Sequence, residues 1–320
     1  MKKPVYLILL SILFLTARIP GKVSLSEGKK CSDCHSSVLH GMFIHGPAKY
    51  DCELCHKPTG QSHPGGEAPA FEFPADGAEM CYYCHESKNT LPIVHAVVEG
   101  GECTVCHLPH SADVKFLLAG EPASYLCEGC HDMEIAEKNF THKPASDGQC
   151  TSCHDPHQSA YSHLLTYEPR DGCIYCHKSM ITELERPFVH KPVLENCSIC
   201  HNPHASTFPS LLRRSFPQGD YFSSGPEGVQ QCYSCHEPLA MVNPSTTTLT
   251  SFRDGSKNLH YLHLSGPKGR SCVLCHNVHA ADNSSLIAQE VRFGKWTMRM
   301  NFLQTGSGGS CLPGCHGELS

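Results

Sequence analysis

One long hydrophobic run opens a chain that otherwise alternates between short polar and short apolar pieces. Residues 5–17 (VYLILLSILFLTA) are uncharged and apolar, and they follow a basic start, MKK. A membrane-spanning helix needs about 20 apolar residues, whereas the apolar part of a signal peptide has about 7–15. We therefore predict a signal peptide over residues 1–22, with an uncleaved anchor as the alternative. No later stretch is apolar enough to cross a bilayer, so the mature chain is expected to be exported without a membrane span.

Beyond residue 22 the pattern predicts short helical turns and irregular connections. Strand-like alternation is scarce, and the 23 Pro and 26 Gly residues interrupt every longer periodic stretch. Two polar insertions, roughly 207–231 and 238–258, are expected to be exposed loops. Residues 281–310, which include the stretch RFGKWTMRM, are expected to link the last motif to the others and to pack on it, with a partner-docking surface as the alternative.

Composition shows that side chains alone cannot build a large core. The 320 residues are 40% hydrophobic, but 22 of them are Cys, so only about a third are other hydrophobic residues, with a single Trp. Bound groups or cross-links must therefore hold the interior together. The formal net charge of −6 argues against a nucleic-acid partner, which would favour a strongly basic face.

All 22 cysteines fall into eleven pairs, and a His directly follows each pair. The ten regular C-x-x-C-H motifs are Cys31/Cys34/His35, Cys52/Cys55/His56, Cys81/Cys84/His85, Cys103/Cys106/His107, Cys127/Cys130/His131, Cys150/Cys153/His154, Cys173/Cys176/His177, Cys197/Cys200/His201, Cys232/Cys235/His236 and Cys272/Cys275/His276. The eleventh, CLPGCH, has one more residue between Cys311 and Cys315 and ends at His316.

C-x-x-C-H is the attachment signature of c-type haem. The two sulfurs add to the haem vinyl groups, and the His is held beneath the iron as its proximal ligand. A disulfide, a redox dithiol or half of a zinc site also uses C-x-x-C, but none of them requires a His at all eleven places. We therefore predict about eleven covalently attached haem c groups.

The motifs alternate between two types that repeat every 46 or 47 residues. Type B motifs begin at Cys103, Cys150, Cys197 and Cys272 and have a second His three residues after the motif, whereas the type A motifs between them lack it. An apolar pair also recurs ten and eleven residues after each type B proximal His, as in Leu117-Leu118 and Leu164-Leu165. The predicted division is a signal peptide (1–22), haem-pair repeats 1 to 5 (23–72, 73–119, 120–166, 167–213 and 214–290) and a final segment with the CxxxCH motif (291–320).

Thirteen His remain after the proximal ones, and eleven irons with two imidazoles each would need eleven. Those at recurring positions are His95, His142, His190 and His263 before the type B motifs, and His110, His157, His204 and His279 after them. Repeat 1 offers His45 and His63, and the candidates for the eleventh position are His40 and His260. His163 stands where other repeats have Phe or Ser, so we favour no ligand role for it. Met80, Met133 and Met180 could ligate instead, but they do not recur in register, and two imidazoles per iron are favoured.

These residues resemble the multihaem c-type cytochromes with paired, or doubled, CxxCH motifs, in the CxxCHxPH element and the upstream His. The resemblance covers residues 31 to 279; repeat 1 lacks the close second His, repeat 5 reads CHNVH, and the last motif is CxxxCH. The resemblance implies bis-His haems stacked into a row that carries electrons across the periplasm or outside the cell. It implies as partners other cytochromes, an outer-membrane conduit or extracellular electron acceptors, and leaves open a homopolymer of the chain.

We therefore expect a multihaem cytochrome c fold: a mostly irregular, elongated and repeat-like chain, with short α-helices around a row of haems and little or no β-sheet. The favoured function is electron transfer without enzyme activity, because six-coordinate iron leaves no site for a substrate. The alternative is a multihaem oxidoreductase that reduces a small nitrogen or sulfur oxyanion at one open iron, for which the irregular last motif is the candidate.

Overall fold

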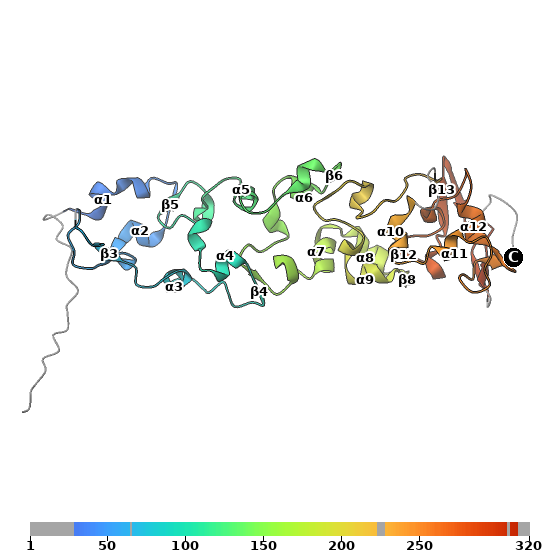
Figure 1. The fold of residues 1–320 in the computed structure, drawn as a ribbon, viewed down its shortest axis with the longest axis horizontal. Coiled ribbons are helices and arrows are strands. Elements are labelled where there is room, and N and C mark those ends of the chain that lie inside the picture. Colours follow the sequence, from blue (N-terminus) through green and yellow to red (C-terminus); the bar gives the residue numbers. More distant parts are fainter. Residues whose placement is uncertain (1–28, 65, 223–227, 306–307, 313–320) are drawn as a thin grey trace, which may run out of the picture. The chain divides into compact units, whose positions relative to one another are not determined.

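The computed structural model describes residues 29–64, 66–222, 228–305 and 308–312. The described chain, drawn as a ribbon in Figure 1, divides by its internal contacts into two compact units: one up to Ser87 together with Ala96–Glu121, the other comprising Lys88–His95 and the described residues from Pro122 onward. The predicted signal peptide and the last two predicted haem-binding residues, Cys315 and His316, lie outside the described residues. The repeat boundaries derived from the sequence stay a prediction.

Short helices carry the motifs, as the sequence predicts. The first Cys of each type A motif lies in an α-helix: α1 (Cys31–Cys34), α3 (Ala78–Tyr82), α5 (Ser124–Glu128), α7 (Pro169–Cys176) and α10 (Gln230–Tyr233). The first Cys of each type B motif begins a 3-10 turn: η2 (Cys52–Leu54), η3 (Cys103–Val105), η6 (Cys150–Ser152), η8 (Cys197–Ile199) and η11 (Cys272–Leu274). No described α-helix is longer than the eight residues of α7.

A second set of helices begins directly after the upstream His residues. These are α2 (Gly46–Tyr50), α4 (Ala96–Glu99), α6 (Lys143–Ser146) and α9 (Lys191–Glu195). In α2, α6 and α9 a Pro occupies the first turn, where its missing N–H costs nothing and its fixed φ favours the helix. The upstream His is therefore held at a helix start.

Two-residue strands join each repeat to the next one. The strand before an upstream His pairs, antiparallel, with the strand after the type B motif of the following repeat. The pairs are β1 (Phe43–Ile44) with β5 (Ser111–Ala112), β4 (Ile93–Val94) with β7 (Gln158–Ser159), β6 (Phe140–Thr141) with β9 (Ala205–Ser206), and β8 (Phe188–Val189) with β12 (Ala280–Ala281). Consecutive repeats are thus interlocked rather than merely linked end to end.

The recurring apolar pairs mark a left-handed turn. The turns are η4 (Lys115–Leu117), η7 (Ser162–Leu164), η9 (Pro209–Leu211) and η12 (Ser284–Leu286). In each, the last two residues have positive φ, for example Ser210 at 55° and Leu211 at 56°. L-residues other than Gly rarely adopt this conformation, which costs roughly 1–2 kcal/mol per residue. Because the strained turn recurs in four repeats, we expect it to position a functional group of the chain.

The remaining elements are local. They are η1 (Ser36–Leu39), η5 (Glu134–Glu137), α8 (Ser179–Leu184), α11 (Leu239–Val242) and α12 (Leu259–Leu264), and the hairpins β2 (Lys57–Pro58) with β3 (Phe71–Glu72), β10 (Arg253–Asp254) with β11 (Lys257–Asn258), β13 (Glu290–Phe293) with β14 (Trp296–Arg299), and β15 (Leu303–Thr305) with β16 (Gly308–Ser310). Every sheet in the described residues has two strands, which confirms the fold class of short helices, irregular chain and little sheet.

The insertions are not simply exposed loops, and here the prediction was wrong. Phe222 and Val229 from the first insertion pack with Leu264 of α12 in a buried cluster. Asn258, at the end of the second insertion, is fully buried, and its amide donates to the carbonyls of Ala240 and Asn243. Single buried anchors hold long polar segments here, and composition averaged over a segment hides them.

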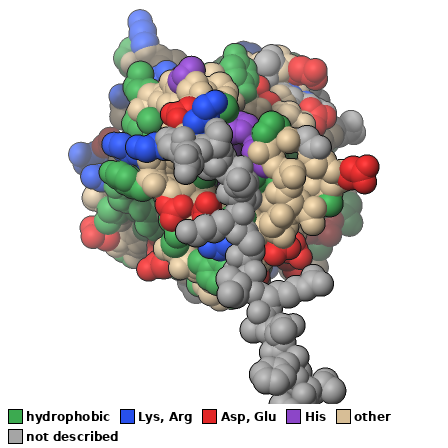
Figure 2. All heavy atoms as spheres, turned by 90° about the vertical axis from the view of Figure 1, so that its left-hand side faces the viewer, with side chains coloured by type: hydrophobic (Ala, Val, Ile, Leu, Met, Phe, Trp, Pro, Cys, Tyr) green, Lys and Arg blue, Asp and Glu red, His purple; other side chains and the backbone are tan. Residues whose placement is uncertain are grey.

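Protein side chains make only a thin core. Twelve hydrophobic residues are buried among the described ones, and seven of them are alanines. Large side chains such as Met42 (77% exposed) and Phe73 (61%) lie at the surface, and on the face drawn in Figure 2 hydrophobic side chains are interspersed with acidic and basic ones. So little apolar burial cannot offset the conformational entropy of a chain of this length.

We therefore predict that chain produced without haem attachment does not fold cooperatively. Thermal circular dichroism of haem-free protein should show a broad, featureless change, whereas the mature protein melts in a defined transition, because bound groups supply the interior. A cooperative melt of haem-free material with the spectrum of the mature protein would contradict this expectation.

Candidate haem-ligand sites

Each regular motif is one helical turn closed by its own backbone. In all ten, the backbone N–H of the proximal His donates to the carbonyl of the first Cys at 2.9–3.0 Å. A turn of this kind places residues i and i+4 on one side, and residue i+3 next to them. The two sulfurs and the imidazole of a motif can therefore face the same group.

The second Cys of a motif is tied to the first, and it often lies closer to solvent. The backbone N–H groups of Cys84, Cys106, Cys130 and Cys235 each donate to the carbonyl of the first Cys in the motif at 3.1–3.3 Å. Every described first Cys is half-buried, whereas Cys84, Cys130 and Cys235 are exposed and Cys106 is half-buried. The chain therefore fixes the position of these second cysteines without enclosing most of them. Their predicted thioether bonds to haem stay predictions.

The type A proximal His residues each lie opposite an upstream His from the preceding repeat. The ring centroids of His85 and His45 are 5.9 Å apart, with 17° between the ring planes. The same arrangement recurs in the second compact unit, at 6.0 Å for His131/His95, 6.1 Å for His177/His142 and 6.0 Å for His236/His190. The upstream His thus faces the motif of the next repeat.

The type B proximal His residues lie opposite a His from the following repeat. The pairs are His56/His110 at 5.9 Å, His154/His204 at 6.0 Å and His201/His279 at 6.2 Å. The close second His of a motif therefore faces the motif before its own. Two neighbouring repeats therefore exchange imidazoles: the earlier repeat places a His opposite the type A motif of the later one, and the later repeat places a His opposite the type B motif of the earlier one.

Two further pairs occur at the ends, where a neighbouring repeat is missing. His63 lies 5.8 Å from His35 in the first motif, and His260 lies 6.5 Å from His276 in the last regular motif. His63 comes from the loop between β2 and β3, and His260 comes from α12. These local segments supply the imidazole that a neighbouring repeat supplies elsewhere.

The spacing of these nine pairs fits one metal atom between two imidazoles. A metal–imidazole bond is about 2 Å, and a ring centroid lies about 1 Å behind its nitrogen, so a bridged pair has its centroids about 6 Å apart. Rings in direct face contact would lie only about 3.5–4.0 Å apart. The observed range of 5.8–6.5 Å matches the bridged arrangement.

Backbone carbonyls orient the rings from behind. The type B proximal rings use the left-handed turn: Nδ1 of His107, His154, His201 and His276 lies 2.7–2.9 Å from the carbonyl oxygen of Phe116, His163, Ser210 and Ser285, respectively. When Nδ1 donates its proton to that carbonyl, Nε2 is left as the metal-binding nitrogen. The strained turn therefore positions the imidazole of a predicted haem ligand.

The upstream His residues are oriented by the repeat ahead. Nδ1 of His142 lies 2.8 Å from the Pro203 carbonyl, and the His142 backbone N–H donates to the His204 carbonyl at 2.8 Å. His45 makes the same two contacts with Pro109 and His110. The x-P-H tripeptide thus positions two imidazoles: its own His, and the His that its backbone binds.

Burial keeps several of these imidazoles neutral. It lowers the pKa of His56, His204, His276 and His279, and it lowers the pKa of His260 to about 4, with His276 and His263 adding to the effect. A neutral imidazole has the free lone pair that a metal requires. The protonation state at neutral pH therefore suits ligation.

The first cysteines of the two motifs in one repeat lie side by side. A hydrogen bond to the Cys173 thiol lowers the pKa of Cys197 to about 6, and burial together with the Cys103 thiol raises the pKa of Cys81 to about 11. No disulfide joins any of the 21 described cysteines. The attachment points of a type A and a type B motif are therefore adjacent.

Several of the predicted ligand roles stay predictions from the sequence. His40 is exposed, and among the described residues its ring stacks on no other imidazole. Nδ1 of His263 lies 2.7 Å from the Leu259 carbonyl oxygen, and its ring lies beside Phe252. The roles of His157 and His263 therefore rest on their register alone, and His40 stays only a candidate for the eleventh position. The roles of Cys315 and His316, which lie outside the described residues, rest on the CxxxCH motif.

The carbonyl-bearing turn is a feature that sequence reasoning missed. The recurring apolar pair pointed to it, but the contact uses only the backbone of the residue before that pair, so the side chain there is free to vary. This is why His163 does not recur: the structure uses its carbonyl oxygen, as it uses that of Phe116 or Ser210.

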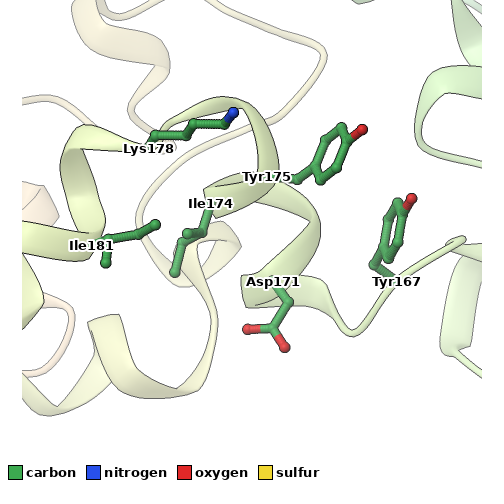
Figure 3. Close-up of a pocket in the computed structure, with 6 residues that line it drawn as sticks. All are labelled: Tyr167, Asp171, Ile174, Tyr175, Lys178 and Ile181. Carbon is green, nitrogen blue, oxygen red and sulfur yellow. The ribbon is translucent and has the colours of Figure 1, made fainter.

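One surface pocket lies on the outer face of the helix that carries the motif at Cys173. It is an open groove of about 370 Å³, lined by Tyr167, Asp171, Ile174, Tyr175, Lys178 and Ile181 (Figure 3). Residues 171, 174, 175 and 178 share one face of α7 and the turn that follows, whereas Cys173, Cys176 and His177 lie on the other. The groove is therefore separate from the haem-attachment face.

None of the helices in the described part of the chain has the length and hydrophobicity that crossing a membrane requires.

The repeated motif turns, the adjacent sulfurs and the paired imidazoles define a multihaem c-type cytochrome with covalently attached haem. The family model for the doubled CXXCH motif matches residues 45–90, 95–136, 142–182 and 190–241, and the chain belongs to this family. It is also similar to a curated protein, the multiheme cytochrome MtrA of Shewanella baltica (strain OS185), with 28% identity over 293 residues that cover 83% of this chain and 81% of that protein.

Substitutions at Ser210 test the left-handed turn. We expect Ser210→Val to lower stability by about 1–2 kcal/mol, because a β-branched residue adopts positive φ only under strain. Ser210→Gly, the matched control, should leave stability unchanged or raise it. Denaturant titration followed by haem absorbance measures both, and equal midpoints for the two variants would show that the turn is not maintained in solution.

Proposed function

We propose that this protein is an electron-transfer cytochrome with eleven haem c groups, each iron held between two imidazoles. The observation that supports this proposal most directly is the set of nine imidazole pairs with ring centroids 5.8–6.5 Å apart, each of which contains the His of a C-x-x-C-H motif. When bound, haem iron supplies one-electron chemistry between its ferric and ferrous states. The chain contributes attachment, ligation and the distance between neighbouring groups.

The proposed second ligands follow from the pairs and from the register. The pairs support a proposed assignment of His63 to the first motif, of His45, His95, His142 and His190 to the type A motifs of repeats 2 to 5, and of His110, His204, His279 and His260 to the type B motifs at His56, His154, His201 and His276. His157 keeps the role its register predicts, and His263 is left for the last motif. These eleven meet the demand, so His40 and His163 are not needed as ligands.

The sulfur contacts support a row in chain order. The first cysteines of the two motifs are neighbours in repeats 1, 2, 4 and 5, and the second Cys of a type B motif is near the next type A motif, as Cys55 is near Cys81 and Cys153 near Cys176. Within each compact unit, consecutive motifs are therefore consecutive in space. Electrons would pass from one haem to the next in the order of the sequence.

Saturated coordination favours a carrier over an enzyme. An iron with two protein imidazoles has no position for a substrate, and its potential lies below that of a His/Met site. We propose that the protein is exported, works in the periplasm or at the outer surface, and exchanges electrons with other redox proteins, as the likeness to a multiheme cytochrome suggests.

Replacing one assigned ligand tests bis-His ligation. His142→Ala should leave the iron of the motif at His177 without its sixth ligand, because His142 is the imidazole opposite. Electron paramagnetic resonance should then show a new high-spin ferric signal from about one haem in eleven. The matched control His163→Ala, in the same repeat, should stay low-spin throughout. A high-spin fraction already present in the wild type would argue for an open iron and a reductase.

Intact mass tests the number of haems. The mature protein should weigh the processed chain plus eleven haems, because every C-x-x-C-H motif forms the same turn and CLPGCH retains both sulfurs and the His. A Cys311→Ala/Cys315→Ala variant should lose one haem and serves as the reference for ten. A wild-type mass equal to that of a ten-haem protein would show that CLPGCH is not a haem site.

A further inference from the structure

The hairpin β13–β14 is fixed against the last two motifs. Val291 and Met300 form a buried cluster with Ala288, and Cys275 and Cys311 pack against that cluster. The backbone N–H of Gly294, in the hairpin turn, donates to the Asp220 carboxylate at 2.9 Å. The hairpin is therefore held as a rigid cover beside the sulfurs of the C-terminal haem sites.

One face of this hairpin is basic, because Arg292 and Arg299 lie on the face opposite to buried Val291, whereas Trp296 pairs with Phe293 on the same face as Val291. Arg292, Lys295 and Arg299 are exposed, and Trp296 is 62% exposed with the Lys295 ammonium 5.1 Å from its ring centroid. Arg299 also lies 3.4 Å from Glu290, which is the acidic side chain of the hairpin. Trp and Arg are the residue types that most often dominate the binding energy of protein interfaces.

A further cation lies behind the hairpin. The Arg270 guanidinium lies 4.6 Å from the Tyr221 ring centroid and 4.8 Å from that of Phe293 in β13. One of its terminal nitrogens is buried without a hydrogen-bond partner. Two aromatic rings thus fix a positive charge next to the exposed cations of the hairpin, which adds to the local potential.

The charge of the chain is divided unequally along its length. Residues 253–312 carry seven basic and three acidic side chains, whereas residues 29–121 carry six basic and twelve acidic ones, and the whole chain has a net charge of −6. An acidic partner is repelled by most of such a chain and attracted to its basic part. Such a separation of charge steers an oppositely charged partner and raises its association rate by about 10- to 1,000-fold.

We propose that the β13–β14 hairpin is the docking surface for an acidic redox protein, which exchanges electrons with the C-terminal haems beneath it. The proposal rests on the proposed electron-transfer function and names the surface and the charge of the partner. Arg292 and Arg299 on the exposed face, together with Lys295 in the hairpin turn, bind the partner's carboxylates. Electrons then leave or enter at the end of the row that the hairpin covers.

Protein-film voltammetry of the mature protein tests this proposal, with a carboxylate-terminated monolayer on gold as the acidic probe surface. At an ionic strength of about 0.01 M, where charges act over about 30 Å, the wild type should give a reversible haem signal. The signal of R292E/K295E/R299E should fall by about tenfold or more. The control K57E/K143E/K191E changes the net charge equally at exposed lysines elsewhere and should keep most of the signal.

The outcomes separate the docking surface from the function. A haem signal on an amine-terminated monolayer but none on the carboxylate surface would overturn the docking proposal and leave electron transfer intact. Equal loss in both triple variants would also overturn it, because charge without location would then explain the binding. No haem signal on either surface would overturn the proposed function itself.

Sedimentation at low salt is a second experiment on the same variants. Self-association that only R292E/K295E/R299E abolishes would show that a second copy of the chain occupies the hairpin, and would overturn the proposal of an acidic redox partner.

Discussion

The rest of this structure depends on the pairing of imidazoles between repeats, in which a His of one repeat lies opposite the proximal His of a neighbouring repeat. The described side chains bury little hydrophobic surface, and most of the buried hydrophobic positions among them are alanines, which allow close approach rather than fill space. The structure instead shows a recurring exchange between consecutive repeats: His142 lies opposite the motif at His177, while His204 lies opposite the motif at His154, and the proposed ligation would join the repeats through these pairs. The short strand pair β6–β9 lies beside this exchange and fixes its register.

The backbone geometry is best understood as support for this exchange. The left-handed turns accept strain in four repeats, and each returns one carbonyl to the Nδ1 of a proximal His. The x-P-H segment makes a similar contribution from the other side, through the carbonyl before its own His. Contacts behind a metal ligand fix the ring orientation and increase its basicity, so they influence the redox potential as well as the affinity.

Sequence patterns predicted the chemistry more completely than the connections. The C-x-x-C-H motifs, the two motif types and ten of the recurring or local His residues could be singled out because each uses a particular side chain. Which His faces which motif could not be predicted, because that depends on β1–β5 and its equivalents, whose two-residue strands have no recognisable pattern. The carbonyl acceptors were invisible for a related reason, since any residue supplies a backbone oxygen. The buried anchors of the insertions, such as Val229 and Asn258, are single residues in polar surroundings.

The end segments have a consequence for how such proteins change in length. His63 and His260 lie opposite the proximal His of the first and the last regular motif from within their own repeats, so the interior repeats need only match one another. Duplication or deletion of one interior repeat in a gene would keep every lent imidazole and every strand partner, because the donor and the acceptor segments recur with the same spacing. Evolution could therefore lengthen or shorten this protein by whole interior repeats while leaving the first repeat and the C-terminal segments unchanged.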